Sequence, residues 1–114
     1  MPEYSTPYKF WKATSTTGQL TAEFDPERAI HIREIRVHSA SANSATCSLT
    51  VQLDDPTGAV YDYVILNQDM EAITDYAQIY DPPLTFENGS TFDVTMGLPA
   101  DSWAHGVSIV YTPI

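Results

Sequence analysis

The chain has 114 residues, 43% of them hydrophobic and 18% charged, and a chain of this length forms one domain with its own core. It contains no apolar run near the roughly 20 residues of a membrane span, and its N-terminus lacks the basic-then-apolar order of a signal peptide. Its single cysteine, Cys47, excludes an internal disulfide. Because Cys47 lies in a strand-like alternation, we expect a buried thiol and folding in a reducing compartment.

The charges are unevenly divided along the chain. All five basic residues lie in the first 36 positions, where five carboxylates balance them, and ten carboxylates between Val37 and Ile114 carry the whole net charge of −10. Nucleic acids and anionic membranes attract cationic surfaces, so we expect neither as a partner. The division favours a basic partner, or contact between the mixed and acidic ends of neighbouring copies. The alternative is that the acidic surface serves solubility.

The first half of the chain is rich in strand signals. Residues 1–15 are expected to form an N-terminal arm or a first strand, and residues 16–114 a single β-sandwich domain. Within 30–37 the apolar alternation shifts by one position, which predicts a β-bulge near Arg33-Glu34. The small polar stretch 39–45 then predicts a loop that crosses between two sheets.

The second half continues with short strands and turns. The pattern predicts a strand at 59–66, a single helical turn within 66–76, and a two-residue hairpin turn at Asn88-Gly89. Strands separated by turn signals at this spacing indicate an all-β, antiparallel β-sandwich or a barrel. The predicted core comprises Ile32, Ile35, Val37, Leu49, Val51, Leu53, Tyr63, Ile65, Phe86, Phe92, Val94, Val107 and Ile109.

The acidic stretch 53–58, LDDPTG, has two interpretations. A calcium site needs six to eight oxygen ligands, commonly from carboxylates at alternating loop positions. Asp54 and Asp55 are adjacent and point apart on an extended backbone, whereas Pro56 and Gly58 suit the positions of a tight turn. The apolar alternation on both sides therefore favours a hairpin.

No other motif indicates catalysis. The three histidines lack the spacing of a zinc site, and the chain has no nucleophile elbow and no glycine-rich phosphate loop. A pair of carboxylates for glycoside hydrolysis could be drawn arbitrarily from fifteen acids, so it carries no information. We expect a protein that is not an enzyme, with no catalytic residues, no cofactor and no metal.

Two binding hypotheses remain. In the first, the chain is an assembly module that docks on copies of itself or on a scaffold. The expected contacts are the N-terminal residues Tyr8, Phe10, Trp11 and Lys12, with Arg33 and Arg36 as salt-bridge donors to a neighbour. The alternative for the N-terminal aromatics is a first strand with every second ring buried.

In the second hypothesis, exposed aromatic rings stack on a carbohydrate. The candidate rings are Trp11, Tyr61, Tyr63, Tyr76, Tyr80 and Trp103. Exposure separates the hypotheses, because a sugar site shows open rings beside carboxylates or amides. An assembly protein instead shows its apolar patch in the arm or at a sheet edge.

The run IREIRVHSASANSATCSLTVQLDDPTGAVYDYVILNQDM, with PPLTFENGSTFDVTM and the final VSIVYT, resembles the small jelly-roll structural proteins of tailed-bacteriophage virions. These include capsid decoration (cement) proteins and related head or tail accessory proteins. The resemblance covers roughly residues 30–112 and rests on a basic strand, a small polar loop, a D-x-x-G hairpin and a late LxFxxGxxFxV segment.

The resemblance implies a jelly-roll-like sandwich that binds in several copies, often as a homotrimer, to the major capsid protein or another virion protein. It implies assembly in the host cytoplasm and a place on the capsid exterior, which an acidic surface suits better than a DNA-facing lumen. The N-terminal arm is shorter than in many decoration proteins. A tail or neck accessory protein is therefore the alternative within the same group, and a carbohydrate-binding module is the alternative outside it.

Overall fold

The computed structural model describes residues 8–16, 19–42, 46–97 and 104–114. Strands make up 67% of this part of the chain. In chain order the elements are β1 (Lys9–Ser15), β2 (Leu20–Phe24), β3 (Ile30–Ser39), β4 (Ser48–Asp54), the short 3-10 helix η1 (Ala59–Tyr61), β5 (Tyr63–Asp69), β6 (Asp75–Phe86), β7 (Thr91–Met96) and β8 (His105–Pro113).

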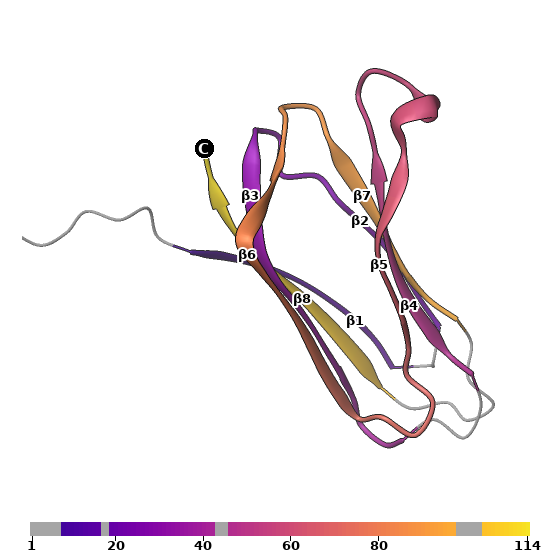
Figure 1. Ribbon diagram of the computed structural model, residues 1–114. Coiled ribbons are helices and arrows are strands. Elements are labelled where there is room, and N and C mark those ends of the chain that lie inside the picture. Colours follow the sequence, from indigo (N-terminus) through magenta and orange to yellow (C-terminus); the bar gives the residue numbers. More distant parts are fainter. Residues whose placement is uncertain (1–7, 17–18, 43–45, 98–103) are drawn as a thin grey trace, which may run out of the picture.

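The strands form two antiparallel four-stranded sheets that pack face to face (Figure 1). One sheet has the order β1-β8-β3-β6 and the other β2-β7-β4-β5, and between β1 and β8 the chain changes sheet at every connection except the β4–β5 hairpin. This order, in which the first and last strands pair and the halves interleave, is that of an eight-stranded jelly roll. The predicted all-β antiparallel sandwich with jelly-roll character is therefore confirmed. Residues 9–15 form a paired first strand rather than a free arm.

The core lies between the two sheets and agrees with the predicted set at all but two positions. Ile65 is half-buried and Tyr63 is 51% exposed. The reason is a bulge in β5: Val51 pairs with Leu66 but the next residue, Gln52, pairs with Val64. The extra residue turns Leu66 inward in place of Ile65 and ends the expected alternation.

Aromatic rings connect the two sheets near one end of the core. Phe24 of β2 lies 5.3 Å from Trp11 of β1 and 4.9 Å from Tyr111 of β8, measured between ring centroids. Phe92 of β7 stacks on Phe24 at 5.6 Å and meets Phe86 of β6 edge-on at 4.8 Å. These offset and edge-on arrangements are the favourable geometries for aromatic pairs.

The turns confirm one prediction and correct two. The Gly58 amide donates to the Asp55 carbonyl, which closes the predicted turn with Pro56 at its first central position. Residues 59–61 form a 3-10 turn, so the strand expected at 59–66 begins later, at Tyr63. Asn88-Gly89 is the centre of a tight turn, because the Ser90 amide donates to the Glu87 carbonyl, but it is not a hairpin. Its flanking strands, β6 and β7, belong to different sheets.

The helical turn expected within 66–76 is absent from the structure. Strand β5 continues to Asp69, a short turn follows in which the Ile73 amide donates to the Met70 carbonyl, and β6 begins at Asp75. The helix-forming residues of this stretch are overridden by strand pairing on both sides.

Candidate functional site

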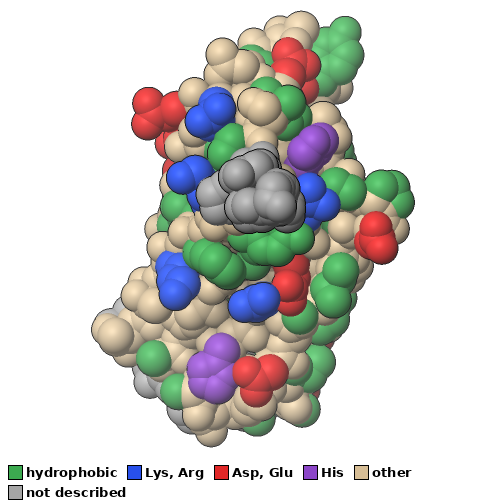
Figure 2. Space-filling model, turned by 90° about the vertical axis from the view of Figure 1, so that its left-hand side faces the viewer, with side chains coloured by type: hydrophobic (Ala, Val, Ile, Leu, Met, Phe, Trp, Pro, Cys, Tyr) green, Lys and Arg blue, Asp and Glu red, His purple; other side chains and the backbone are tan. Residues whose placement is uncertain are grey.

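Four of the six predicted partner-contact residues lie together on the outer face of the β1-β8-β3-β6 sheet. Figure 2 looks onto this side of the molecule and shows Lys and Arg side chains gathered around hydrophobic ones. A hollow of about 350 Å³ on this face is lined by Tyr8, Phe10, Arg33 and Arg36, together with Glu34, Ile79, Tyr80, Asp81 and Val110. We call Tyr8, Phe10, Arg33, Ile79 and Val110 the outer-face patch.

Strand register explains how the apolar residues of the patch come together. Phe10 pairs with Val110, Val110 with Glu34, and Glu34 with Ile79, so these four residues form one row across the four strands. Phe10 is 52% exposed and Ile79 is 66% exposed, while Val110 is buried beneath them. Exposed apolar side chains that cluster in this way mark an interaction site, whereas scattered ones do not.

The structure confirms the predicted bulge in β3, and this bulge places Arg33 on the outer face. Ile32 pairs with Tyr111 and Glu34 with Val110, which are consecutive in β8, so Arg33 is the extra residue. Its Nε donates to the Thr112 hydroxyl at 3.4 Å, and its guanidinium lies 5.7 Å from the centroid of the Tyr8 ring. Bulges often re-aim a side chain at a functional site, and this one aims a cation over an aromatic ring.

The other predicted contact residues lie differently. Trp11 points inward, is half-buried and packs on Phe24, so it belongs to the core, as the first-strand alternative anticipated. Lys12 is exposed in the next row, where it pairs with Ser108. Arg36 is already paired within the chain: its guanidinium makes two contacts of 3.0 and 3.1 Å with the Glu34 carboxylate. This pairing raises the pKa of Arg36 above its usual value.

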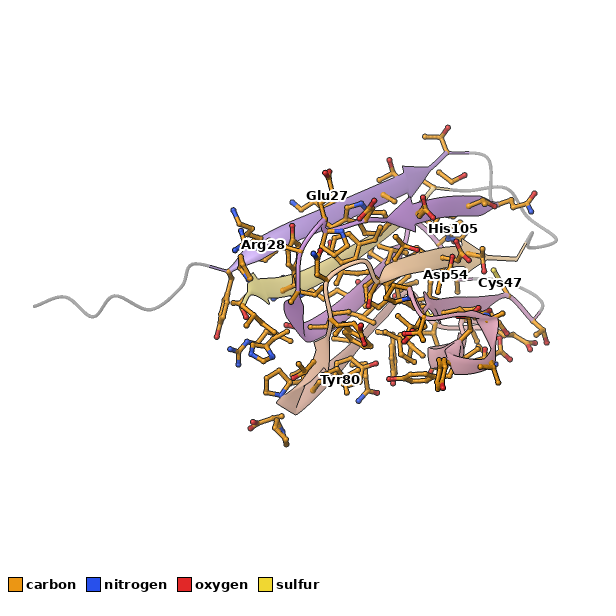
Figure 3. All side chains as sticks on the ribbon, turned by 90° about the horizontal axis from the view of Figure 1, so that it is seen from above. Glu27, Arg28, Cys47, Asp54, Tyr80 and His105 are labelled. Atoms are coloured by element: carbon orange, nitrogen blue, oxygen red, sulfur yellow. The ribbon has the colours of Figure 1, made fainter. Side chains whose placement is uncertain are left out.

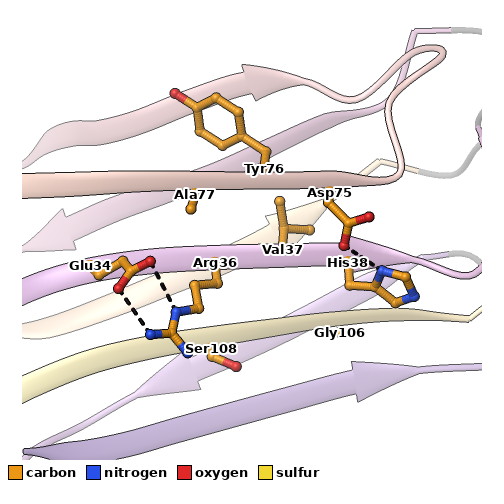
Figure 4. Close-up of a pocket in the computed structure, with 9 residues that line it drawn as sticks. All are labelled: Glu34, Arg36, Val37, His38, Asp75, Tyr76, Ala77, Gly106 and Ser108. Carbon is orange, nitrogen blue, oxygen red and sulfur yellow. Dashed lines mark hydrogen bonds and ion pairs between the residues drawn. The ribbon is translucent and has the colours of Figure 1, made fainter.

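A second, shallower groove of about 570 Å³ continues along the same face (Figure 4). Its floor is formed where small residues Ser108, Gly106 and Ala77 lie between longer neighbours. His38 Nδ1 donates to Asp75 Oδ1 at 2.7 Å, and this hydrogen bond lowers the pKa of Asp75. In this groove Arg36 pairs with Glu34 and His38 pairs with Asp75. The groove therefore leaves fewer charged groups free to bind a partner than the outer-face patch does.

The β2-β7-β4-β5 sheet carries negative charge. Strands β2, β7, β4 and β5 contain no Lys or Arg, and their carboxylates are Glu23, Asp93, Asp54 and Asp69. Glu23 and Asp93 even pair directly across neighbouring strands, an arrangement that costs stability. The two sheets of the sandwich are thus a mixed, partly basic layer and an acidic layer.

The β4–β5 hairpin exposes a second apolar cluster that the sequence pattern did not reveal. Val60 is 86% exposed, Tyr61 58%, Tyr63 51% and Val64 46%. We call these four residues the hairpin tip; its 3-10 turn lies at one end of the sandwich (Figure 1). The clue in the sequence was an apolar run directly after a turn, but the expected strand alternation suggested burial.

The carboxylates at the base of this hairpin hold its backbone. Asp55 Oδ1 accepts the Thr57 amide at 2.8 Å, and Asp62 Oδ1 accepts the Asp55 amide at 2.8 Å. Within the parts of the chain that the structure describes, no group of three or more His, Cys, Asp or Glu side chains is arranged to hold a metal. Asp55 and Asp62 therefore stabilise the hairpin through these backbone hydrogen bonds, in agreement with the hairpin interpretation.

Of the candidate sugar-stacking rings, Tyr61 and Tyr63 are open to solvent. Trp11, Tyr76 and Tyr80 are half-buried and pack against the core. The Tyr80 hydroxyl donates to the carbonyl of Ile65, the residue at the β5 bulge, at 3.1 Å, and burial raises the pKa of Tyr80. Trp103 lies outside the described residues.

The buried polar pair Ser39–His105 joins β3 to β8 inside the sandwich; Figure 3 labels His105. Ser39 Oγ and His105 Nδ1 are 2.8 Å apart, and both residues are almost fully buried. His105 Nε2 is buried and has no hydrogen-bond partner among the described residues.

Stability should depend on the protonation of His105. Burial lowers the pKa of His105 below the ordinary 6.5, so below that pH the unfolded chain binds a proton that the folded chain excludes. We expect the free energy of unfolding to fall between about pH 7.5 and about pH 5.5. His105→Asn keeps an acceptor near the Nδ1 position without titrating, and denaturant unfolding at both pH values should show a weaker pH dependence in this variant. If the free energy of unfolding depends on pH equally in the parent and in His105→Asn, His105 is not the group responsible.

The strand order defines a jelly-roll β-sandwich, and the outer face of its β1-β8-β3-β6 sheet carries apolar and basic side chains. No protein-family model matches the sequence, and no relative is found among curated proteins. Among solved structures the chain is similar to PirA, with a TM-score of 0.55 and 14% identity over 94% of this chain and 97% of that one. At this identity the likeness concerns the fold alone.

Two further similarities are weaker. The Yersinia pseudotuberculosis-derived mitogen gives a TM-score of 0.46 and 14% identity over 96% of this chain and 88% of that one. A chain of the infectious bursal disease virus Gx strain structure gives 0.44 and 13% over 93% of this chain and 32% of that one. All three proteins are β-sandwiches. In the described part of the present chain no helix is long and apolar enough to cross a membrane.

Proposed function

We propose that the chain is a non-enzymatic structural protein of a virion, a capsid decoration subunit that binds the major capsid protein lattice and stabilises the head. In this proposal it acts as a homo-oligomer on the capsid exterior after assembly in the host cytoplasm, without nucleic acid or membrane partners. The observation that carries the proposal is the outer-face patch, which combines exposed apolar side chains with a cation on one face of a sheet.

The patch has the composition of a protein-docking surface. Aromatic residues and arginine are enriched in the centres of such interfaces, and here Tyr8, Phe10 and Arg33 surround one hollow. No carboxylate lies within ion-pair distance of Arg33 in the described part of the chain. An incoming protein surface could therefore add a charge partner without displacing an existing one.

Rigid β-sheet placement supports the same proposal. The patch is built on four hydrogen-bonded strands, with Arg33 fixed by a bulge. A preorganised surface loses little conformational entropy on docking. A lattice protein present in many copies benefits from such a surface, because each copy must bind in one orientation.

The first experiment is mass spectrometry of purified virions of a phage whose genome encodes the chain. We expect the chain in intact particles and in isolated heads. Its presence in isolated tails alone would favour the tail or neck alternative, and its absence from particles would overturn the virion assignment.

A binding experiment then tests the patch. Heads lacking the protein are incubated with the purified chain, with Arg33→Glu, and with Ile79→Glu, and bound protein is measured after sedimentation. We expect each patch variant to bind about tenfold more weakly or worse. Arg28→Glu, which makes the same charge change in the exposed β2–β3 loop, should bind as the parent does. Equal binding by all variants would remove the patch from the proposal.

Carbohydrate binding is the second candidate, favoured by the exposed rings of Tyr61 and Tyr63 near carboxylates on the hairpin. A glycan array with the parent chain and Tyr61→Ser separates the two functions. A sugar signal that disappears in Tyr61→Ser would support a carbohydrate-binding module, and no signal would leave docking as the function of the surface.

A further inference from the structure

The outer-face patch and the hairpin tip are complementary in shape and in charge. The patch is a hollow lined by apolar side chains and the cation Arg33, beside Asp81 and the internally paired Glu34 and Arg36. The tip is an apolar projection, and the segment 54–62 that carries it includes three aspartates and no basic residue. We infer that the hairpin tip of one copy docks into the outer-face patch of a second copy. This inference rests on the proposed function and extends it, because the same patch, on a copy that is not docked on the capsid protein, would receive the tip of a neighbouring copy.

The tip has the exposure that an inserted group requires. Val60 is the most exposed of the large hydrophobic side chains in the described part, at 86%, and Tyr61 is 58% exposed. The tip lies on a hairpin whose turn is held by backbone and aspartate hydrogen bonds. Its rings and methyl groups are thus presented on a fixed loop, which lowers the entropy cost of docking.

The patch offers the matching cavity. Its hollow of about 350 Å³ has room for an aromatic side chain, with Val110 as floor and Phe10 and Ile79 as walls. Arg33 at its edge has no carboxylate partner within the described residues. The exposed Asp54 beside the incoming tip supplies the opposite charge. Burial of apolar area would supply most of the affinity, and the charges would select the orientation.

The contact is between two different surfaces. The patch lies on the outer face of the β1-β8-β3-β6 sheet, whereas the tip belongs to the β4–β5 hairpin of the other sheet. A copy that uses its tip still has an open patch, so the contact can repeat from copy to copy. Such heterologous contacts produce rings when the rotation closes and open chains when it does not.

Light scattering of purified proteins tests this docking. The parent should show a mass that rises with concentration above the monomer value of 12.6 kDa, and the rise should weaken with salt. The tip variant, Val60→Ser with Tyr61→Ser, and the patch variant, Ile79→Glu, should each remain monomeric. Arg28→Glu should associate like the parent.

An equimolar mixture of the two variants gives the sharpest result. The tip variant retains its patch and the patch variant retains its tip, so the mixture should form a species of about twice 12.6 kDa and nothing larger. A monomeric mixture, or a parent that stays monomeric up to several hundred micromolar, would overturn the inference. If Ile79→Glu fails to fold, as judged by its thermal transition, Arg33→Glu takes its place.

The outcomes separate this inference from the proposed function. A monomeric parent that still binds heads through the patch overturns tip docking and leaves the decoration role standing. A parent that associates as expected but is absent from virions overturns the decoration role and leaves the self-docking standing.

Discussion

Replacing Phe24 by alanine is expected to lower the free energy of unfolding by about 3–5 kcal/mol. Phe24 is 1% exposed and contacts rings from three other strands, two of them in the opposite sheet. Truncation would remove these contacts and leave a cavity that close-packed neighbours fill incompletely. For a domain of this size the melting temperature should fall by roughly 12 °C or more.

Phe10→Ala provides the matched control, because it is the same substitution on the outward side of β1. Phe10 is 52% exposed, so the loss should stay below about 1 kcal/mol. Denaturant unfolding of the parent and both variants makes the comparison. Similar losses in the two variants would mean that the aromatic cluster does not join the sheets as described.

Replacing Gly89 by alanine is expected to cost about 1–3 kcal/mol. Gly89 has a φ of 96°, which side chains disfavour, and a Cβ built there would lie 3.0 Å from Pro56 Cβ. The β6–β7 turn therefore packs against the turn of the β4–β5 hairpin, and the added methyl group would strain both. Thermal unfolding measures the effect.

Gly97→Ala is the control for Gly89→Ala. A Cβ at Gly97 would have no atom within 4 Å, and its φ lies outside the left-handed range. We expect a change within about 0.5 kcal/mol. A Gly89→Ala variant as stable as Gly97→Ala would show that the two turns do not constrain each other.

Much of the fold could be predicted from the sequence, because burial on one face imposes a period of two on each strand. This period identified Leu49, Val51 and Leu53 as core residues and, where it shifted, the β3 bulge. The bulge in β5 was missed because Ile65 and Leu66 are both apolar, so no polar residue marks the shift. The sequence also does not show which strands pair. A tight turn at Asn88-Gly89 fits a hairpin and a crossing between sheets equally well, and here it joins two sheets.

The candidate site was predictable in part. Tyr8, Phe10 and Arg33 were chosen by residue type, and the register of β1, β8 and β3 brings them to one hollow. Ile79 and Val110 were not chosen, since their contribution depends on which strands are neighbours. The sequence does not distinguish the inward Trp11 from the outward Phe10, because both positions of this first strand carry aromatics.

The separation of charge between the sheets has a consequence for how the molecule meets a charged body. The basic side chains of β1 and β3 belong to one sheet, while the β2-β7-β4-β5 sheet has none. The molecule is therefore an electric dipole directed from one sheet to the other. In the field of a charged surface it experiences a torque before contact, and at separations within the Debye length of about 10 Å it arrives with one side already facing that surface.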